Sequence, residues 1–252
     1  MENAAIDQKF MRRALGLARR GAGKTSPNPC VGAVIVRNGR IIGEGWHRAA
    51  GLPHAEIEAI RNARKRRATV RGATLYVTLE PCSTWGRTPP CTNALFAAGI
   101  KRVVAGAKDL NPKHAGRGFK LLRKSGIQVT EGVLRKECEQ LNRAWNHWIA
   151  HRKPWVIAKC GMTLDGKIAT ANGESRWITG KKARHEAHRL RARVDAVLVG
   201  VNTVLKDDPL LTVRLPRWKG RQPLRVVLDT HARTPPNARI LNFSGTNALR
   251  PY

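Results

Sequence analysis

The sequence predicts an α/β protein with two domains, and two observations carry this prediction. Short runs of β-branched residues alternate with amphipathic helical patterns over residues 7–149, which is typical of a three-layer α/β/α sandwich. A charged link that ends in proline, residues 151–154, then separates this pattern from a new one. We therefore expect a first domain at residues 1–150 and a second domain at residues 151–252.

The first domain is expected to begin with a helix followed by a β-hairpin. The helix spans residues 7–20, with Asp7 as its N-cap and Gly21 just beyond its end. Apolar runs at residues 31–36 and 41–46 flank Asn38-Gly39, a dipeptide that tolerates positive φ. This arrangement predicts two antiparallel strands joined by a tight turn.

The remaining elements of the first domain follow the same alternation. The predicted strands cover residues 73–79, 103–107 and 127–130, and the predicted helices cover residues 54–67, 91–98, 119–124 and 134–149. A further strand at residues 155–159 is expected to open the second domain.

Composition narrows the class of protein. With 252 residues and 42% hydrophobic content, the chain can bury a sizeable core. It has no run of 18 apolar residues for a membrane span, and residues 1–20 lack the apolar segment of a secretory signal. Its five cysteines are odd in number, which favours a reducing compartment over a disulfide framework. We expect a cytoplasmic protein.

The formal net charge of +30 raises the question of a nucleic-acid partner. The excess of basic residues is spread over both predicted domains rather than gathered into a stripe. Its densest run, residues 61–71, lies on the exposed end of a predicted helix and has few aromatic residues to stack on bases. A solvated helix face is the favoured interpretation. For the function of the whole chain, the charge leaves a nucleic-acid base deaminase or a basic RNA-binding protein as the alternative.

One stretch of the first domain has the composition of a catalytic zinc site. His54 begins a His-x-Glu motif with Glu56, and Cys82 and Cys91 follow downstream. One imidazole and two thiolates make three protein ligands, so a tetrahedral Zn²⁺ would keep one position for water. In zinc deaminases the Glu of His-x-Glu carries protons and does not bind the metal. A core histidine with two unrelated cysteines is the alternative, but the four groups occur together and in order.

Longer stretches around these residues resemble a known family. They are Ser26 to Gly32, the motif at His54, and the run from Leu79 to Cys91, and they resemble the deaminase half of the bifunctional riboflavin-biosynthesis deaminase/reductase. The resemblance implies a cytidine-deaminase-like fold and hydrolytic deamination of 2,5-diamino-6-ribosylamino-4(3H)-pyrimidinone 5′-phosphate. It also implies that Asn28 contacts the substrate. A turn asparagine that bonds its own backbone is the alternative for Asn28.

The second domain resembles the reductase half of the same family, which has a dihydrofolate-reductase-like fold and uses NADPH. The resemblance is carried by residues 159–169, 173–180, 190–192, 199–204, 207–214 and 226–229. It implies cofactor contacts at Gly161, Trp177, Thr203 and Asp207, and substrate contacts at Ser175, Arg191, Leu211 and Arg214. The two arginines suit this role because a guanidinium pairs with a phosphate through two hydrogen bonds.

The short stretch after Asp229 has little room for further strands and for a glycine-rich phosphate loop. We expect a partial reductase domain whose sheet has an unpaired edge, which a second copy of the chain or another partner would cover. Reduction by this chain alone is therefore not expected. Residues 242–252 are expected to form an irregular tail.

Overall fold

The structure is a computed structural model that describes residues 2–86, 89–112, 114–218 and 220–241. The tail expected at residues 242–252 lies outside the described residues. The chain divides into two compact units, Met1–Val156 and Ile157–Tyr252. Within the described ranges, no helix is long and apolar enough to cross a membrane.

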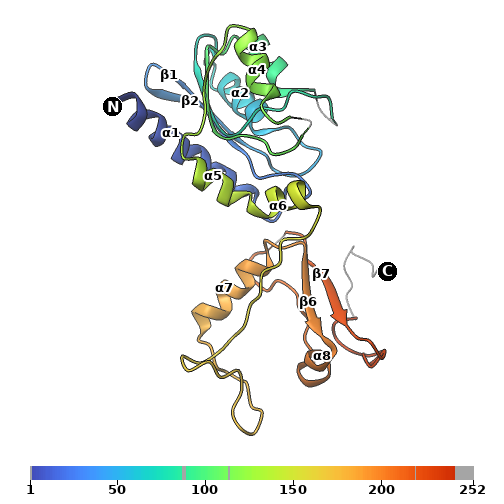
Figure 1. Ribbon diagram of the computed structural model, residues 1–252. Coiled ribbons are helices and arrows are strands. Elements are labelled where there is room, and N and C mark those ends of the chain that lie inside the picture. Colours follow the sequence, from blue (N-terminus) through green and yellow to red (C-terminus); the bar gives the residue numbers. More distant parts are fainter. Residues whose placement is uncertain (1, 87–88, 113, 219, 242–252) are drawn as a thin grey trace. The chain divides into compact units, whose positions relative to one another are not determined.

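The first unit is built on a five-stranded sheet with the order β2-β1-β3-β4-β5 (Figure 1). Its strands are β1 (Gly32–Arg37), β2 (Arg40–Trp46), β3 (Thr74–Leu79), β4 (Arg102–Ala107) and β5 (Gln128–Thr130). β1 runs antiparallel to β2 and to β3, whereas β3, β4 and β5 are parallel. Asn38 and Gly39 both have positive φ in the turn between β1 and β2, which confirms the predicted hairpin.

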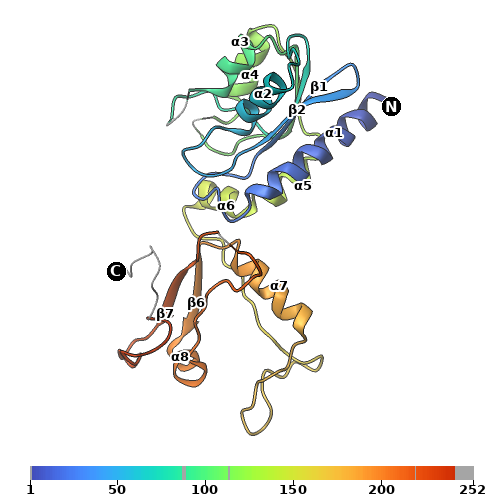
Figure 2. The same cartoon turned by 180° about the vertical axis from the view of Figure 1, so that it is seen from behind.

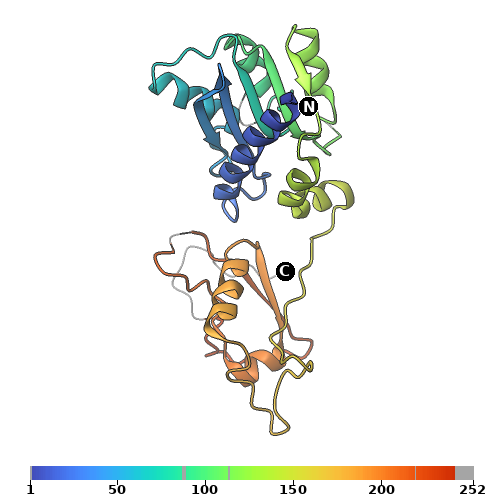
Figure 3. The ribbon, with the colours of Figure 1, turned by 90° about the vertical axis from the view of Figure 1, so that its left-hand side faces the viewer.

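Helices cover both faces of this sheet (Figures 2 and 3). On one face, α1 (Glu2–Ala18) and α5 (Arg135–Leu141) pack on a core that includes Met11, Leu17 and Tyr76. The other face is covered by α2 (Ala55–Lys65), α3 (Cys91–Ala97) and α4 (Arg117–Lys124). Alternate residues of β1 serve the two cores, since Val34 belongs to the first and Ile35 to the second. The predicted three-layer α/β/α sandwich is confirmed.

The N-terminal helix differs from the prediction at both ends. It begins at Glu2, so Asp7 is an interior residue and not an N-cap. Asp7 is buried, where Arg102 donates to both of its carboxylate oxygens and the Tyr76 hydroxyl donates to one of them. A 3₁₀ turn (Arg19–Gly21) follows, so Gly21 is part of a helical turn and does not terminate the helix.

The single helix predicted for residues 134–149 is also wrong. Two helices occupy this region, α5 and α6 (Arg143–His151), and they meet at Asn142. Asn142 is buried, and its φ of −107° and ψ of 19° depart from helical values. Its side chain is bonded to the distant backbone of Cys30, so a tertiary contact occupies the position where the helix breaks.

The second unit contains a two-stranded parallel sheet formed by β6 (Ala196–Gly200) and β7 (Leu224–Leu228). Its helices are α7 (Lys181–Arg191) and α8 (Val201–Asp207). Val204, Leu211 and Ile240 form a small core beside the sheet. The strand predicted at residues 155–159 is absent from the described secondary structure, and Val156 is 79% exposed. The sheet of this unit pairs β6 with β7 alone, so the apolar run has no neighbouring strand to bond its backbone.

Candidate metal centre and active site

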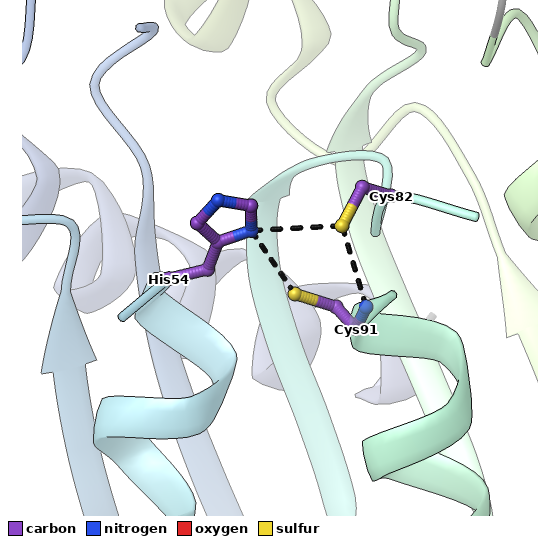
Figure 4. Close-up of side chains that lie close together, drawn as sticks. All are labelled: His54, Cys82 and Cys91. Carbon is purple, nitrogen blue, oxygen red and sulfur yellow. Dashed lines mark hydrogen bonds between the residues drawn. The ribbon is translucent and has the colours of Figure 1, made fainter. Parts of the chain in front are cut away.

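The three predicted zinc ligands lie close together (Figure 4). His54 is the N-cap residue of α2, Cys82 follows β3 in the chain, and Cys91 is the first residue of α3. The Nδ1 atom of His54 is 3.2 Å from Cys91 Sγ and 3.5 Å from Cys82 Sγ. Their ligand atoms all lie within 4.8 Å of one another. A strand end and two helix starts therefore bring together groups that are far apart in the sequence.

The chemistry of this donor set fits a zinc ion. An imidazole nitrogen and two sulfurs are preferred zinc ligands, and thiolates are the binding form of cysteine. The hydrogen bond with the Cys91 thiol lowers the pKa of Cys82, and the hydrogen bond with His54 lowers it further. The same bond between the sulfurs raises the pKa of Cys91. The site thus favours a thiolate at Cys82, and a cation placed between the sulfurs would favour a thiolate at Cys91 too.

Glu56 lies in the first turn of α2, beside the ligands but outside the metal-binding group. Its side chain is 3% exposed, and burial raises its pKa, with the charge of Cys82 adding to the effect. Interaction with His54 opposes this rise. A raised pKa favours the protonated form of a carboxyl group more than the pKa of an exposed glutamate would. Glu56 is thus a buried carboxyl group next to the predicted ligands.

Asn28 belongs to a pair of polar residues that the sequence analysis identified only in part. Its side-chain amide donates to Nε2 of His47 at 3.1 Å, and Nδ1 of His47 donates to the carbonyl of Pro53 at 3.2 Å. Burial lowers the pKa of His47, which favours a neutral ring with its proton on Nδ1. The ring of His47 lies 5.3 Å from that of His54. This contact orients Asn28 near the metal centre, and the sequence signal for His47 was only its place seven residues before His54.

Two acidic residues near Cys82 were also missed. Glu80 is buried, and its carboxylate accepts hydrogen bonds from the backbone amides of Asp109, Gly116 and Gly118. Burial raises the pKa of Asp109 to about 6, and the charges of Glu80 and Cys82 contribute to this rise. Glu80 lies in the run from Leu79 to Cys91, but its backbone partners follow it by about thirty to forty residues. A one-dimensional pattern does not reveal them.

The second unit contains a cavity of about 570 Å³ with a strongly basic lining. It gathers Gly161, Arg191 and Arg214 from the predicted contact residues, together with Lys159 and Arg184. The guanidinium of Arg191 donates to the carbonyl of Thr212 at 2.8 Å. Burial lowers the pKa of Arg191, and the positive charge of Arg214 acts in the same direction. Two cations held this close create a potential that favours an anion.

The other predicted residues of the second unit do not line this cavity. Trp177 is 73% exposed. The guanidinium carbon of Arg184 lies over its indole ring, 4.2 Å from the ring centroid. Thr203 and Asp207 are on α8, and Leu211 is buried with a φ of 52°. Ser175 is exposed. The structure therefore brings together three of the eight predicted contacts in one place.

Two family models match the chain, one in each part. The cytidine and deoxycytidylate deaminase zinc-binding region matches residues 4–107, and the RibD C-terminal domain matches residues 154–248. The first is a cytidine-deaminase-like domain, and the second is a domain of the dihydrofolate-reductase-like class. These assignments agree with the fold predicted for each part.

Similar proteins cover nearly the whole of this chain. The riboflavin biosynthesis protein RibD of Escherichia coli is 48% identical over 95% of this chain and 67% of its own length. RibD of Aquifex aeolicus is 49% identical over 94% of this chain. This chain spans 65% of the length of the Aquifex protein and 61% of that from Actinobacillus pleuropneumoniae.

Solved structures similar to this chain indicate the same family as the sequence relatives do. A diaminohydroxyphosphoribosylaminopyrimidine deaminase/5-amino-6-(5-phosphoribosylamino)uracil reductase from Thermotoga maritima superimposes with a TM-score of 0.90. It is 47% identical, and the match covers 95% of this chain and 68% of that one. RibD of Acinetobacter baumannii superimposes with a TM-score of 0.87 at 44% identity, over 94% of this chain and 67% of the other. Identity at this level across both units shows that the chain belongs to the RibD family of riboflavin biosynthesis proteins.

Proposed function

We propose that the first unit catalyses a deamination step of riboflavin biosynthesis. Its substrate would be 2,5-diamino-6-ribosylamino-4(3H)-pyrimidinone 5′-phosphate, and its products a pyrimidinedione and ammonia. The observation that carries this proposal is the buried Glu56 beside three convergent zinc ligands, His54, Cys82 and Cys91. Family membership gives the substrate class.

His54, Cys82 and Cys91 would hold the metal. Zinc bound by these three residues supplies Lewis-acid activation of a water molecule. The two cysteines enter from different elements, and the Cys91 amide donates to Cys82 Sγ at 3.3 Å. This hydrogen bond orients one ligand and stabilises its thiolate form.

Glu56 would act as general base and then as general acid. It accepts a proton from the attacking water and transfers it to the ring nitrogen of the pyrimidine. It then takes the remaining proton of the added hydroxyl and delivers it to the departing amine, so that the carbonyl forms as ammonia leaves. Burial keeps its pKa above the usual range, so the proton is held long enough to be passed on. General acid–base catalysis of this kind contributes typically ~10² to 10⁴ in rate.

Asn28 would orient the heterocycle at the mouth of the site. Its amide nitrogen already donates to the neutral ring of His47, which fixes the side chain and leaves its amide oxygen as an acceptor. An acceptor there can pair with an exocyclic amino group of the pyrimidine.

We propose that the second unit belongs to a reductase domain that takes NADPH and a ribosyl phosphate. The contacts carried over from the family are Gly161, Trp177, Thr203 and Asp207 for the cofactor, and Ser175, Arg191, Leu211 and Arg214 for the substrate. The basic cavity around Arg191 and Arg214 suits a phosphate, since both ligands carry one. On this assignment residues 1–150 are the deaminase domain and residues 151–252 contribute to the reductase.

The proposal includes a cytoplasmic location and self-association. The β6–β7 sheet leaves Leu198 and Leu228 more than half exposed, which a second chain could cover. Nucleic acid is not proposed as a partner. Binding of RNA that falls steeply with added salt would instead support the alternative of a basic RNA-binding protein.

The test is an ammonia-release assay on the pyrimidine substrate, with zinc measured in the same sample. We expect turnover that depends on about one zinc per chain and is abolished by a chelator. NADPH binding is measured separately by fluorescence titration, with NADPH oxidation followed on the deaminated product. Absence of ammonia release from zinc-loaded protein would refute the deaminase assignment whatever the second unit does.

A further inference from the structure

Glu80 is a buried carboxylate whose hydrogen bonds have no direct part in metal binding. Its side chain is 3% exposed, and it lies between the end of β3 and the ligand Cys82. Its Oε2 accepts from the amide of Asp109 at 3.2 Å and from that of Gly116 at 2.9 Å. Its Oε1 accepts from the amide of Gly118 at 2.9 Å. Burying a carboxylate is costly, and three backbone donors offset that cost.

These three donors enclose one loop. Asp109 follows β4, whereas Gly116 and Gly118 are the N-cap and an early residue of α4. Asp109 and Gly116, which stand at the two ends of this loop, are therefore bonded to a single side chain. The negative charge also lies at the start of a helix, where free amides and the helix dipole favour an anion.

The two glycines make this fastening possible. Gly116 has a φ of 87°, a conformation that other residues rarely adopt. A Cβ on Gly118 would lie 2.2 Å from the carbonyl oxygen of Pro81 and 3.1 Å from Oε1 of Glu80. The start of α4 thus approaches the segment that carries Cys82 more closely than any side chain would allow.

The helix start that follows this loop approaches Pro81, the residue before the ligand Cys82. Asp109 is buried and lies within electrostatic reach of Cys82, and its carboxylate accepts the amide of Asn111 at 2.7 Å. Cys82 follows Glu80 by two residues in the same segment. A displacement of this loop would change the wall of the site without removing a ligand or Glu56.

We propose that Glu80 is a positioning residue for the deamination: through Asp109, Gly116 and Gly118 it holds the start of α4 beside the segment that carries Cys82, and so sets the shape of the pyrimidine-binding site. This inference rests on the proposed function. It assigns the loop position, and with it substrate affinity, to a carboxylate that touches neither the metal nor the substrate.

The test uses Glu80→Gln in the full chain. The amide keeps the size of the side chain, but its nitrogen cannot accept a hydrogen bond. Only its oxygen can therefore accept from the three backbone amides. We expect KM for the pyrimidine substrate to rise at least tenfold, kcat to change less than threefold, and zinc to remain at about one per chain. Amide hydrogen exchange should accelerate at residues 109, 116 and 118.

Further variants keep the proposal falsifiable if Glu80→Gln folds poorly. Gly118→Ala places a methyl group against the Pro81 carbonyl and Oε1 of Glu80, so it disturbs the same contact from the α4 side. Its effect on KM should be non-additive with that of Glu80→Gln. Glu80→Asp retains the charge with a shorter reach and should restore part of the affinity. Glu131→Gln removes an exposed carboxylate that pairs with Arg123, and it should leave KM unchanged.

The outcomes separate this inference from the proposed function. Parental protein that releases no ammonia would refute both. Turnover in the parent with an unchanged KM in Glu80→Gln and Gly118→Ala would overturn this inference alone. A lower melting temperature without any change in KM would assign Glu80 a purely structural role and would also overturn it.

Discussion

The side chain of Asn142 pairs with both backbone groups of Cys30. Its Oδ1 accepts from the Cys30 amide at 2.8 Å, and its Nδ2 donates to the Cys30 carbonyl at 2.9 Å. Asn142 is 5% exposed and separates α5 from α6, and Cys30 ends the loop that carries Asn28. The end of the first unit therefore holds a loop from its beginning in place.

Asn142→Ala should destabilise the first unit. It removes two partly buried hydrogen bonds to the backbone of Cys30, at a cost of about 1–3 kcal/mol. Chemical denaturation followed by circular dichroism measures this loss. Asn146→Ala is the matched control, because the side-chain hydrogen bond that Asn146 donates to the Glu139 carbonyl is long, at 3.3 Å. Equal stability in the two variants would contradict the proposed importance of the Cys30 contact.

Glu56→Gln should keep zinc and lose deamination. The amide preserves the size of the buried side chain but cannot accept the proton, so ammonia release should fall by about 10² or more. Zinc content by elemental analysis provides the control in the same sample. Turnover within tenfold of the parent would show that another group carries the proton.

Replacing any of the three ligands should remove the metal. His54→Ala, Cys82→Ser and Cys91→Ser each leave two ligands, so zinc content should fall well below one per chain and stability should fall with it. Cys160→Ser is the control, since Cys160 is exposed in the second unit. Full zinc occupancy in a variant would remove that residue from the site.

Arg191→Gln and Arg214→Gln should weaken binding of a ribosyl phosphate by the second unit. Each change removes one of two neighbouring cations from the basic cavity, which lowers its attraction for an anion. Isothermal titration with the deaminated product in low salt measures the effect, and we expect about a tenfold or larger loss of affinity. Arg233→Gln, outside this cavity, should bind as the parent does.

The ion pair of Arg13 and Glu44 should make stability depend on pH in the acid range. Both nitrogens of Arg13 on this side donate to the Glu44 carboxylate, and this lowers the pKa of Glu44 below its usual 4.5. A lowered carboxyl pKa stabilises the folded state above the unfolded-state pKa, and that stability is lost as pH falls through the folded-state pKa. Because Arg13 is half exposed, we expect only about 0.5 kcal/mol. In Glu44→Gln the unfolding free energy should fall less steeply with acid between about pH 5 and pH 3.

The sequence by itself determined the alternation of strands and helices and the residues of the metal centre. β1 to β5 lie where apolar runs of strand length predicted them, and Asn38-Gly39 makes the predicted turn. Such features depend on neighbours in the chain, because side-chain period and turn geometry are local. The proposed zinc ligands and Glu56 could be predicted because they occupy short motifs whose chemistry restricts the residue type.

Tertiary structure decided the features whose partners are distant in the chain. Asp7 is a buried acceptor and not a helix cap, because it meets Tyr76 and Arg102, which lie 69 and 95 residues away. The helix predicted at residues 134–149 breaks at Asn142, whose partner lies 112 residues away. In each case a buried polar group must be satisfied, and only the folded chain supplies the atoms that do so.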